Sequence, residues 1–155
     1  MLNRLLPRQA DNGYEGLRAG LWLLAPVLLI KSLMGFNAIF LGRYVAAGAD
    51  AIPLDRYGPE AEAAVLTLFA LWGLGQLVLG LQGAIVLVRY RRLVPLLYLV
   101  LLFEHLARKL LFMLYPITRS AEGQPASALA INLAVLGLLA AGFVMSLLRR
   151  RSRNA

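Results

Sequence analysis

The sequence predicts an all-α integral membrane protein, an antiparallel bundle of four transmembrane helices with both termini in the cytoplasm. Three observations predict this fold. Hydrophobic residues make up 60% of the 155 positions, charged residues make up only 15%, and the mean hydropathy is +0.70. A soluble domain of this length is nearer half apolar and keeps a charged surface. We therefore expect a single domain over residues 1–155, with spans at about 17–44, 63–88, 93–115 and 126–148.

Each apolar stretch is long enough to cross a hydrocarbon core of about 30 Å at about 1.5 Å per residue. Within lipid, a spanning segment must bond its own backbone groups, so these stretches are expected to be helices. Prolines mark their ends. Pro59 and Pro95 fall at the starts of the second and third helices, and Pro116 follows the third. Pro26 lies inside the first helix and predicts a kink.

Arginines are distributed unequally between the two sets of connections, and this distribution predicts the orientation. One side carries ten: Arg4, Arg8, Arg18, Arg89, Arg91, Arg92, Arg149, Arg150, Arg151 and Arg153. The other side carries three, together with five acidic residues: Arg43, Arg56 and Arg119, with Asp50, Asp55, Glu60, Glu62 and Glu122. Basic residues favour the cytoplasmic side, so we expect both termini there. The abundance of Ala, Leu, Gly and Arg suggests a bacterial inner (plasma) membrane.

The formal charge of +8 does not predict a nucleic-acid partner. Nucleic-acid binding needs basic residues gathered on a folded polar face, whereas these lie between apolar runs. The expected partners are membrane lipids, and either another membrane protein or a second copy of this chain. With no cysteine and only one histidine, no metal site, disulfide or cofactor is expected.

Three polar residues fall near the middle of predicted spans and should lie at a similar depth. Lys31 is on the first helix, Gln76 on the second and Glu104 on the third. An unpaired charge near the bilayer centre costs several kcal/mol, so such residues are usually paired. We therefore expect a Lys31–Glu104 ion pair, bridged by Gln76.

The third helix also carries a dense run of ionisable residues in its outer half. Glu104 and Arg108 are four residues apart and share one helix face, as do His105 and Lys109. With neighbouring amides they predict a polar pocket with excess positive charge, suited to a lipid phosphate, a carboxylate or a quinone headgroup. The predicted ligand-binding residues are Lys31, Asn37, Gln76, Glu104, His105, Arg108, Lys109 and Asn132.

Two other interpretations of this run stay open. The ion pairs and amides could be structural, with Lys109 reaching toward the membrane surface. Glu104 and His105 could instead relay protons.

Small residues on two helices allow close approach of a neighbouring helix, either within the chain or in an oligomer: Gly73, Gly80, Gly83 and Ala84 on the second, and Ala134, Gly137 and Ala141 on the fourth.

The first predicted helix contains the segments 17–21 (LRAGL) and 30–36 (IKSLMGF). These resemble the first helix of DoxX-like small membrane proteins, which also have four spans and a lysine late in that helix. The resemblance covers one helix. It implies a small membrane protein in redox or respiratory housekeeping.

Three functions remain, and the first is preferred on sequence alone. The chain is expected to be a non-enzymatic accessory subunit that binds other membrane proteins. The alternatives are a lipid- or small-anion-binding or transport protein, and a membrane enzyme that uses Glu104 or His105 as acid or base. Ionisable residues that converge on an open cavity would favour the alternatives. A closed, mutually paired core would favour the subunit.

Overall fold

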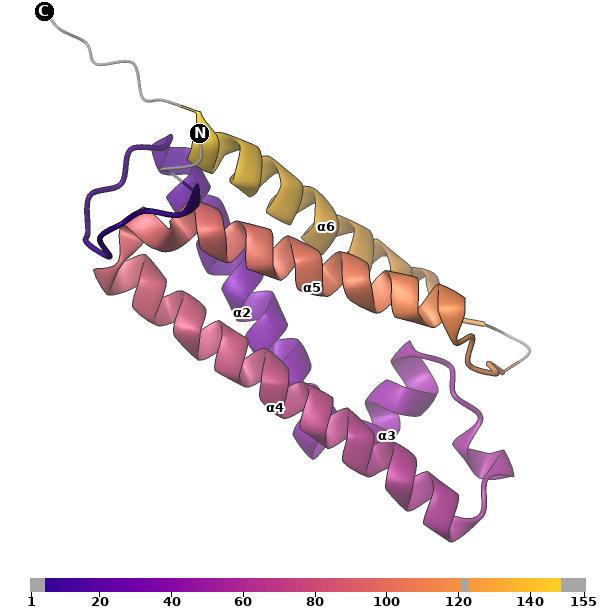
Figure 1. Ribbon diagram of the computed structural model, residues 1–155. Helices are drawn as coiled ribbons and strands as arrows, with labels where there is room; N and C mark the ends of the chain where they lie inside the picture. The colour runs from indigo at the N-terminus through magenta and orange to yellow at the C-terminus, as the bar shows by residue number, and fades with distance from the viewer. Residues whose placement is uncertain (1–4, 121–122, 149–155) are drawn as a thin grey trace, which may run out of the picture.

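The protein is built from helices, and the computed structural model describes residues 5–120 and 123–148. Helices account for 79% of it, and no strand occurs in those two ranges. Figure 1 shows four long helices: α2 (Arg18–Phe40), α4 (Pro59–Arg89), α5 (Val94–Leu114) and α6 (Ala126–Leu147). Short turns connect them: α3 (Gly42–Tyr44), the π-helical η1 (Val45–Ala49), and the 3₁₀ turns η2 (Leu54–Arg56) and η3 (Arg91–Leu93).

Three of these helices, α2, α4 and α6, are long and apolar enough to cross a membrane, which indicates a membrane protein. The helix α5 has 21 residues, but Glu104, Arg108 and Lys109 lower its apolar character and it is not among the three. The expected first span, at about 17–44, extends beyond the end of the observed helix α2. The helix α2 ends at Phe40, and the chain bends at Leu41 although its apolar run continues. Of the orienting residues, Arg4, Glu122 and the arginines after residue 148 lie outside the described ranges.

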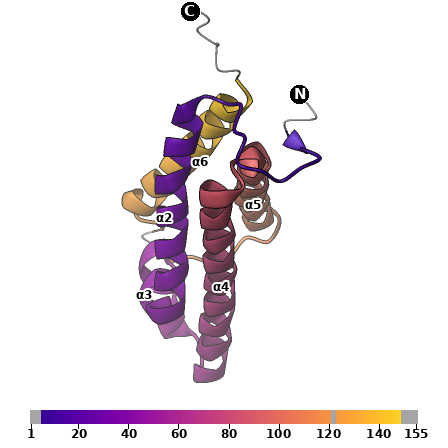
Figure 2. The same ribbon diagram turned by 90° about the vertical axis from the view of Figure 1, so that its left-hand side faces the viewer.

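The helices α2 and α4 pack backbone to backbone through glycines (Figure 2). A Cβ on Gly35 would lie 2.7 Å from the carbonyl oxygen of Gly73, and a Cβ on Gly73 would lie 2.6 Å from that of Gly35. Gly80 and Gly83 face side chains of the same helix, α2. The small-residue face expected on α4 therefore serves contacts within the chain.

A buried apolar core joins α2, α5 and α6. Leu24, Leu101 and Leu139 are fully buried in it, as is Tyr98. The hydroxyl of Tyr98 donates a hydrogen bond of 2.8 Å to the carbonyl oxygen of Gly20. Tyr98 therefore ties α5 to the start of α2 and fixes the register of α5 against its neighbours.

The segment before α2 packs across one end of the bundle. Its Asp11 forms an ion pair with Arg92, 2.7 Å long, and the backbone N–H of Leu17 bonds to the carbonyl oxygen of Met145. Bonds from Gly13 and Arg92 lower the pKa of Asp11. Burial raises the pKa of Tyr14 to about 12.

At the opposite end, the segment between α2 and α4 meets the connection between α5 and α6 (Figure 1). The backbone N–H of Ser120 donates to the carbonyl oxygen of Ala51 at 2.7 Å. Ala46, Ile52 and Leu54 form a second small core there against α4. This packing holds η1 over the ends of α5 and α6, where the candidate site lies.

Candidate functional site

The polar residues at mid-helix form a closed cluster. Lys31 Nζ lies 2.6 Å from Glu104 Oε2, and Gln76 Nε2 donates to Glu104 Oε1 at 2.9 Å. The side chain of Lys31 is 4% exposed and that of Glu104 is 23% exposed. The expected Lys31–Glu104 ion pair is thus confirmed as a contact, and Gln76 bonds to the other carboxylate oxygen of Glu104 instead of bridging it to Lys31. These three side chains bond to one another, and none of them lines the pocket described next.

An open pocket lies next to this cluster, toward the end of the bundle that η1 covers. It has a volume of about 470 Å³ and is lined by α2, α3, η1, α4, α5 and α6. We call it the Arg108 pocket, after its cationic residue. Its other polar lining includes Asn37, Asp50, Trp72 and Asn132. A smaller pocket of about 200 Å³ shares the side chains of Asp50, Trp72 and Arg108, so these three lie between the two hollows.

Arg108 is held in place from two sides. Its Nη2 donates to Asn132 Oδ1 at 3.2 Å, and its guanidinium carbon lies 5.3 Å from the centre of the Trp72 ring. The amide nitrogen of Asn132 donates to the carbonyl oxygen of Ala128, which turns the amide oxygen toward Arg108. The hydrogen bond to Asn132 and the contact with the Trp72 ring fix the orientation of the guanidinium. A guanidinium held in this way can bind a carboxylate or phosphate through two parallel hydrogen bonds.

Two hydrogen-bond donors beside the pocket have no partner within the described ranges. They are Arg108 Nε and Trp72 Nε1, and both atoms are buried. Buried donors are almost always bonded in folded proteins, so an unpaired set of this kind needs an acceptor. A ligand oxygen in the pocket would supply one.

Asp50 adds a carboxylate to the Arg108 pocket, and the sequence did not predict a carboxylate from this segment there. Its Oδ1 accepts a hydrogen bond of 3.0 Å from Gln124 Nε2. Burial raises the pKa of Asp50 above its ordinary value of 3.8, while the charge of Arg108 and the bond from Gln124 act in the opposite direction. The pocket therefore contains one guanidinium and one carboxyl group whose charge depends on pH.

The structure separates the eight predicted residues into groups. Asn37, Arg108 and Asn132 line the pocket, whereas Lys31, Gln76 and Glu104 form the closed cluster. His105 is 1% exposed, and neither ring nitrogen has a partner in the described ranges. His105 and Lys109 do not line the pocket. The pocket therefore does not have the expected excess of positive charge, because Arg108 is accompanied in its lining by Asp50.

Sequence reasoning missed Asp50 and Trp72. Trp72 lies inside an apolar run, where an aromatic residue indicates packing. Asp50 lies in the connection between the first two long helices, and the sequence placed it only among the acidic residues of the outer side. The one sequence signal for Asp50 was the length of the connection between these two helices, because a long loop between two spans can fold back over the bundle.

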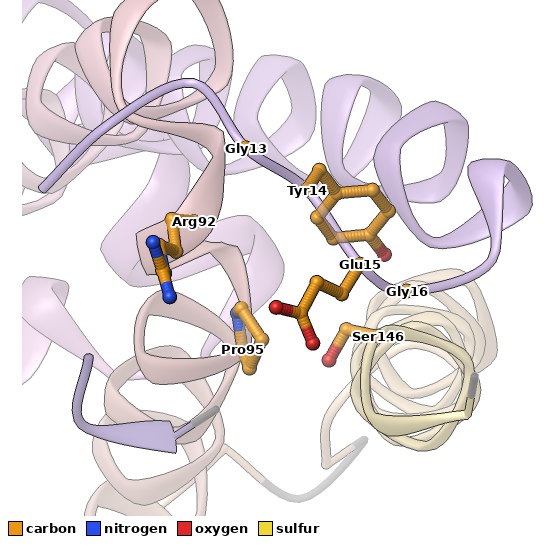
Figure 3. A pocket seen from close by; sticks show the side chains of 7 residues that line it. All are labelled: Gly13, Tyr14, Glu15, Gly16, Arg92, Pro95 and Ser146. Carbon is orange, nitrogen blue, oxygen red and sulfur yellow. The ribbon is translucent and has the colours of Figure 1, made fainter. Parts of the chain in front are cut away.

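A third hollow, at the other end of the bundle, is too small for a ligand. Figure 3 shows it between the chain at Gly13–Gly16, Arg92, Pro95 and Ser146. Its volume of about 20 Å³ holds about one water molecule. The Arg108 pocket is therefore a better candidate than this hollow.

No family model, curated protein or solved structure matches this chain. The resemblance of the first helix to DoxX-like proteins consequently stays a prediction from those residues alone. The function has to be argued from the pocket.

Proposed function

We propose that this protein binds an amphipathic anion in the Arg108 pocket, as a lipid- or small-anion-binding or transport protein of the bacterial inner membrane. One observation carries the proposal: Arg108 faces an open pocket with a buried, unpaired donor, and Trp72 presents a second. Apolar side chains such as Met34 and Ile131 line the same pocket. A ligand with a carboxylate or phosphate and an apolar body satisfies both kinds of surface.

The proposal includes four membrane crossings with both termini in the cytoplasm. The charges of α5 are compatible with a crossing, because Glu104 is paired and Arg108 is hydrogen-bonded. In this arrangement η1 and the α5–α6 connection lie on the outer side, and η3 on the inner side.

The sequence contains no cysteine, so single cysteines report the topology cleanly. We expect a membrane-impermeant maleimide added to spheroplasts to label Arg56→Cys and Arg119→Cys, and to label Arg91→Cys only after lysis. If α5 does not cross, positions 91 and 119 lie on the same side and are labelled alike.

The binding function is tested by native mass spectrometry of protein extracted gently from its own membrane. We expect a co-purifying carboxylate or phosphate compound, reduced at least about tenfold in Arg108→Gln, because charge-assisted bonds contribute about 1.5–3 kcal/mol each. Arg56→Gln removes the same charge from an exposed position and serves as the control. Retention of the compound in Arg108→Gln, or a protein that carries none, would contradict the proposal.

An accessory-subunit role is the second candidate, favoured by one face of α6. Ala130, Ala134, Gly137 and Ala141 follow one another at helical spacing, and all four are exposed. Such a face suits close packing against another helix. A stoichiometric protein partner in the same mass spectra, lost in Gly137→Leu, would make this role the better one.

A further inference from the structure

A groove on the surface between α2 and α4 has the chemistry of a headgroup site. It lies between the start of α2 and the end of α4, at the end of the bundle away from the Arg108 pocket, and has a volume of about 410 Å³. Arg18 and Arg91 are among its lining residues, and Leu21, Trp22 and Ala25 of α2 form one of its walls.

The two arginines have no carboxylate partner in the part of the chain that the structure describes. Within residues 5–120 and 123–148, the ion pairs are those of Lys31, Arg43 and Arg92, and neither Arg18 nor Arg91 takes part in one. Arg91 Nε donates to the carbonyl oxygen of Leu87 at 2.9 Å, which anchors the guanidinium and leaves its outer nitrogens available. Both side chains are exposed. Two cations thus face one groove without a counter-ion.

The groove changes from charged to apolar along the helix axis. Both α2 and α4 are candidate spans, so their ends lie near the level of lipid headgroups. From Arg18 to Ala25 the helix rises about 10 Å, which leads from that level into the acyl region. Trp22 is 78% exposed, and Val88 on the facing helix α4 is 70% exposed. The groove therefore has exposed apolar surface on both helices.

We propose that this groove binds an anionic phospholipid. Its phosphate accepts hydrogen bonds from Arg18 and Arg91, and an acyl chain lies along Trp22 and Ala25. A zwitterionic lipid carries its own cation beside the phosphate, which the two guanidiniums repel. The groove therefore selects for net negative lipids over phosphatidylcholine. This site is independent of the Arg108 pocket, which lies at the other end of the bundle.

Fluorescence of Trp22 tests the proposal directly. The chain has two tryptophans, so the Trp72→Phe variant reports on Trp22 alone. Reconstituted into phosphatidylcholine nanodiscs, this variant is titrated with brominated-chain phosphatidylglycerol or brominated-chain phosphatidylcholine. We expect quenching that saturates at a low fraction of brominated phosphatidylglycerol, and only gradual quenching by brominated phosphatidylcholine.

The arginines are then removed in matched pairs. Arg18→Gln with Arg91→Gln should raise the half-quenching fraction of phosphatidylglycerol about tenfold or more, because each basic residue near the surface contributes separately to anionic-lipid binding. Arg56→Gln with Arg119→Gln removes the same charge from exposed positions at the other end and should leave quenching unchanged.

Three outcomes would overturn the proposal. One is equal quenching by the two lipids, and another is an equal effect of the two double variants. The third is displacement of phosphatidylglycerol by millimolar inorganic phosphate, which would assign the arginines to a free anion. Circular dichroism confirms the helix content of each variant. Arg18→Lys with Arg91→Lys, which keeps both charges, should retain more of the preference than the glutamine pair.

Discussion

Replacing Glu104 with glutamine tests the energetics of the buried cluster. The change keeps the shape of the side chain but leaves Lys31, which is 4% exposed, without its counter-ion. Breaking a buried ion pair from one side costs about 3–5 kcal/mol. Glu104 is itself 23% exposed, and the new amide oxygen still accepts one hydrogen bond. We therefore expect a loss at the lower end of that range, about 3 kcal/mol in the free energy of unfolding.

Thermal unfolding in a mild detergent measures the effect against a matched control. Glu62→Gln makes the same chemical change in the Arg43–Glu62 pair, where the Arg43 side chain is 66% exposed, and an exposed pair contributes about 0–1 kcal/mol. For a chain of this length 1 kcal/mol corresponds to about 2–4 °C, so Glu104→Gln should lower Tm by about 6–12 °C and Glu62→Gln by under about 4 °C. Equal decreases would refute the reasoning.

A double variant separates the charge from the packing. Lys31→Met combined with Glu104→Gln removes the unpaired ion as well as its former partner. Because replacing a whole buried pair by uncharged residues is often close to neutral, most of the lost stability should return. If the double variant unfolds as early as Glu104→Gln, the loss comes from altered packing at position 104.

Three further predictions follow from local geometry. Gly73→Ala should lower Tm, since overpacking against a backbone carbonyl costs about 1–3 kcal/mol, whereas Gly75→Ala, with open space around it, should be neutral or slightly stabilising. His105→Leu should leave Tm unchanged or higher because neither ring nitrogen has a hydrogen-bond partner among the described residues, and a large decrease in Tm would reveal such a partner. Burial raises the pKa of Asp50 above 3.8, so its negative charge is lost as pH falls through that raised value. Binding of a phosphodiester, which stays ionised in this pH range, should therefore strengthen at Arg108 as pH falls, and Asp50→Asn should give strong binding with a flat pH profile.

The closed cluster could be predicted from the sequence because depth along a helix is simple to count. Each residue advances the helix by about 1.5 Å, so the positions of Lys31, Gln76 and Glu104 within their spans place them at one level. The cost of an unpaired charge then leaves few arrangements. The same counting placed Arg108 and Asn132 together, and they are hydrogen-bonded.

The pocket could not be predicted in full because its wall comes from an irregular segment. The chain from Leu41 to Tyr57 has neither helical nor strand periodicity, and Ala51 adopts a positive φ of 58°. Its position depends on contacts with the connection after α5, such as the bond from Gln124 to Asp50. No local pattern encodes those contacts. The glycines of α4 were equally ambiguous, since a small-residue face does not state whether its partner is α2 or another chain.

The proposed crossing of α5 has to accommodate three charges within the membrane. Three charges exclude it on hydropathy, but each charge has a way to be accommodated. Glu104 accepts two hydrogen bonds, Arg108 bonds to Asn132, and Lys109 is close enough to the helix end for its long side chain to reach the surface. The cost of placing α5 in the membrane therefore depends on α2 being there to supply Lys31.

This dependence can be measured with the cysteine reporter at the far end of α5. In the Arg119→Cys background, Lys31→Met leaves Glu104 with one donor in place of two. We expect a smaller fraction of molecules labelled from outside, because an uncompensated carboxylate makes the crossing of α5 less favourable. Leu33→Met changes an exposed residue of the same helix without removing a charge and should leave labelling unchanged. Equal labelling in all three proteins would mean that α5 crosses independently of the pair, and that Lys31 and Glu104 act only after insertion.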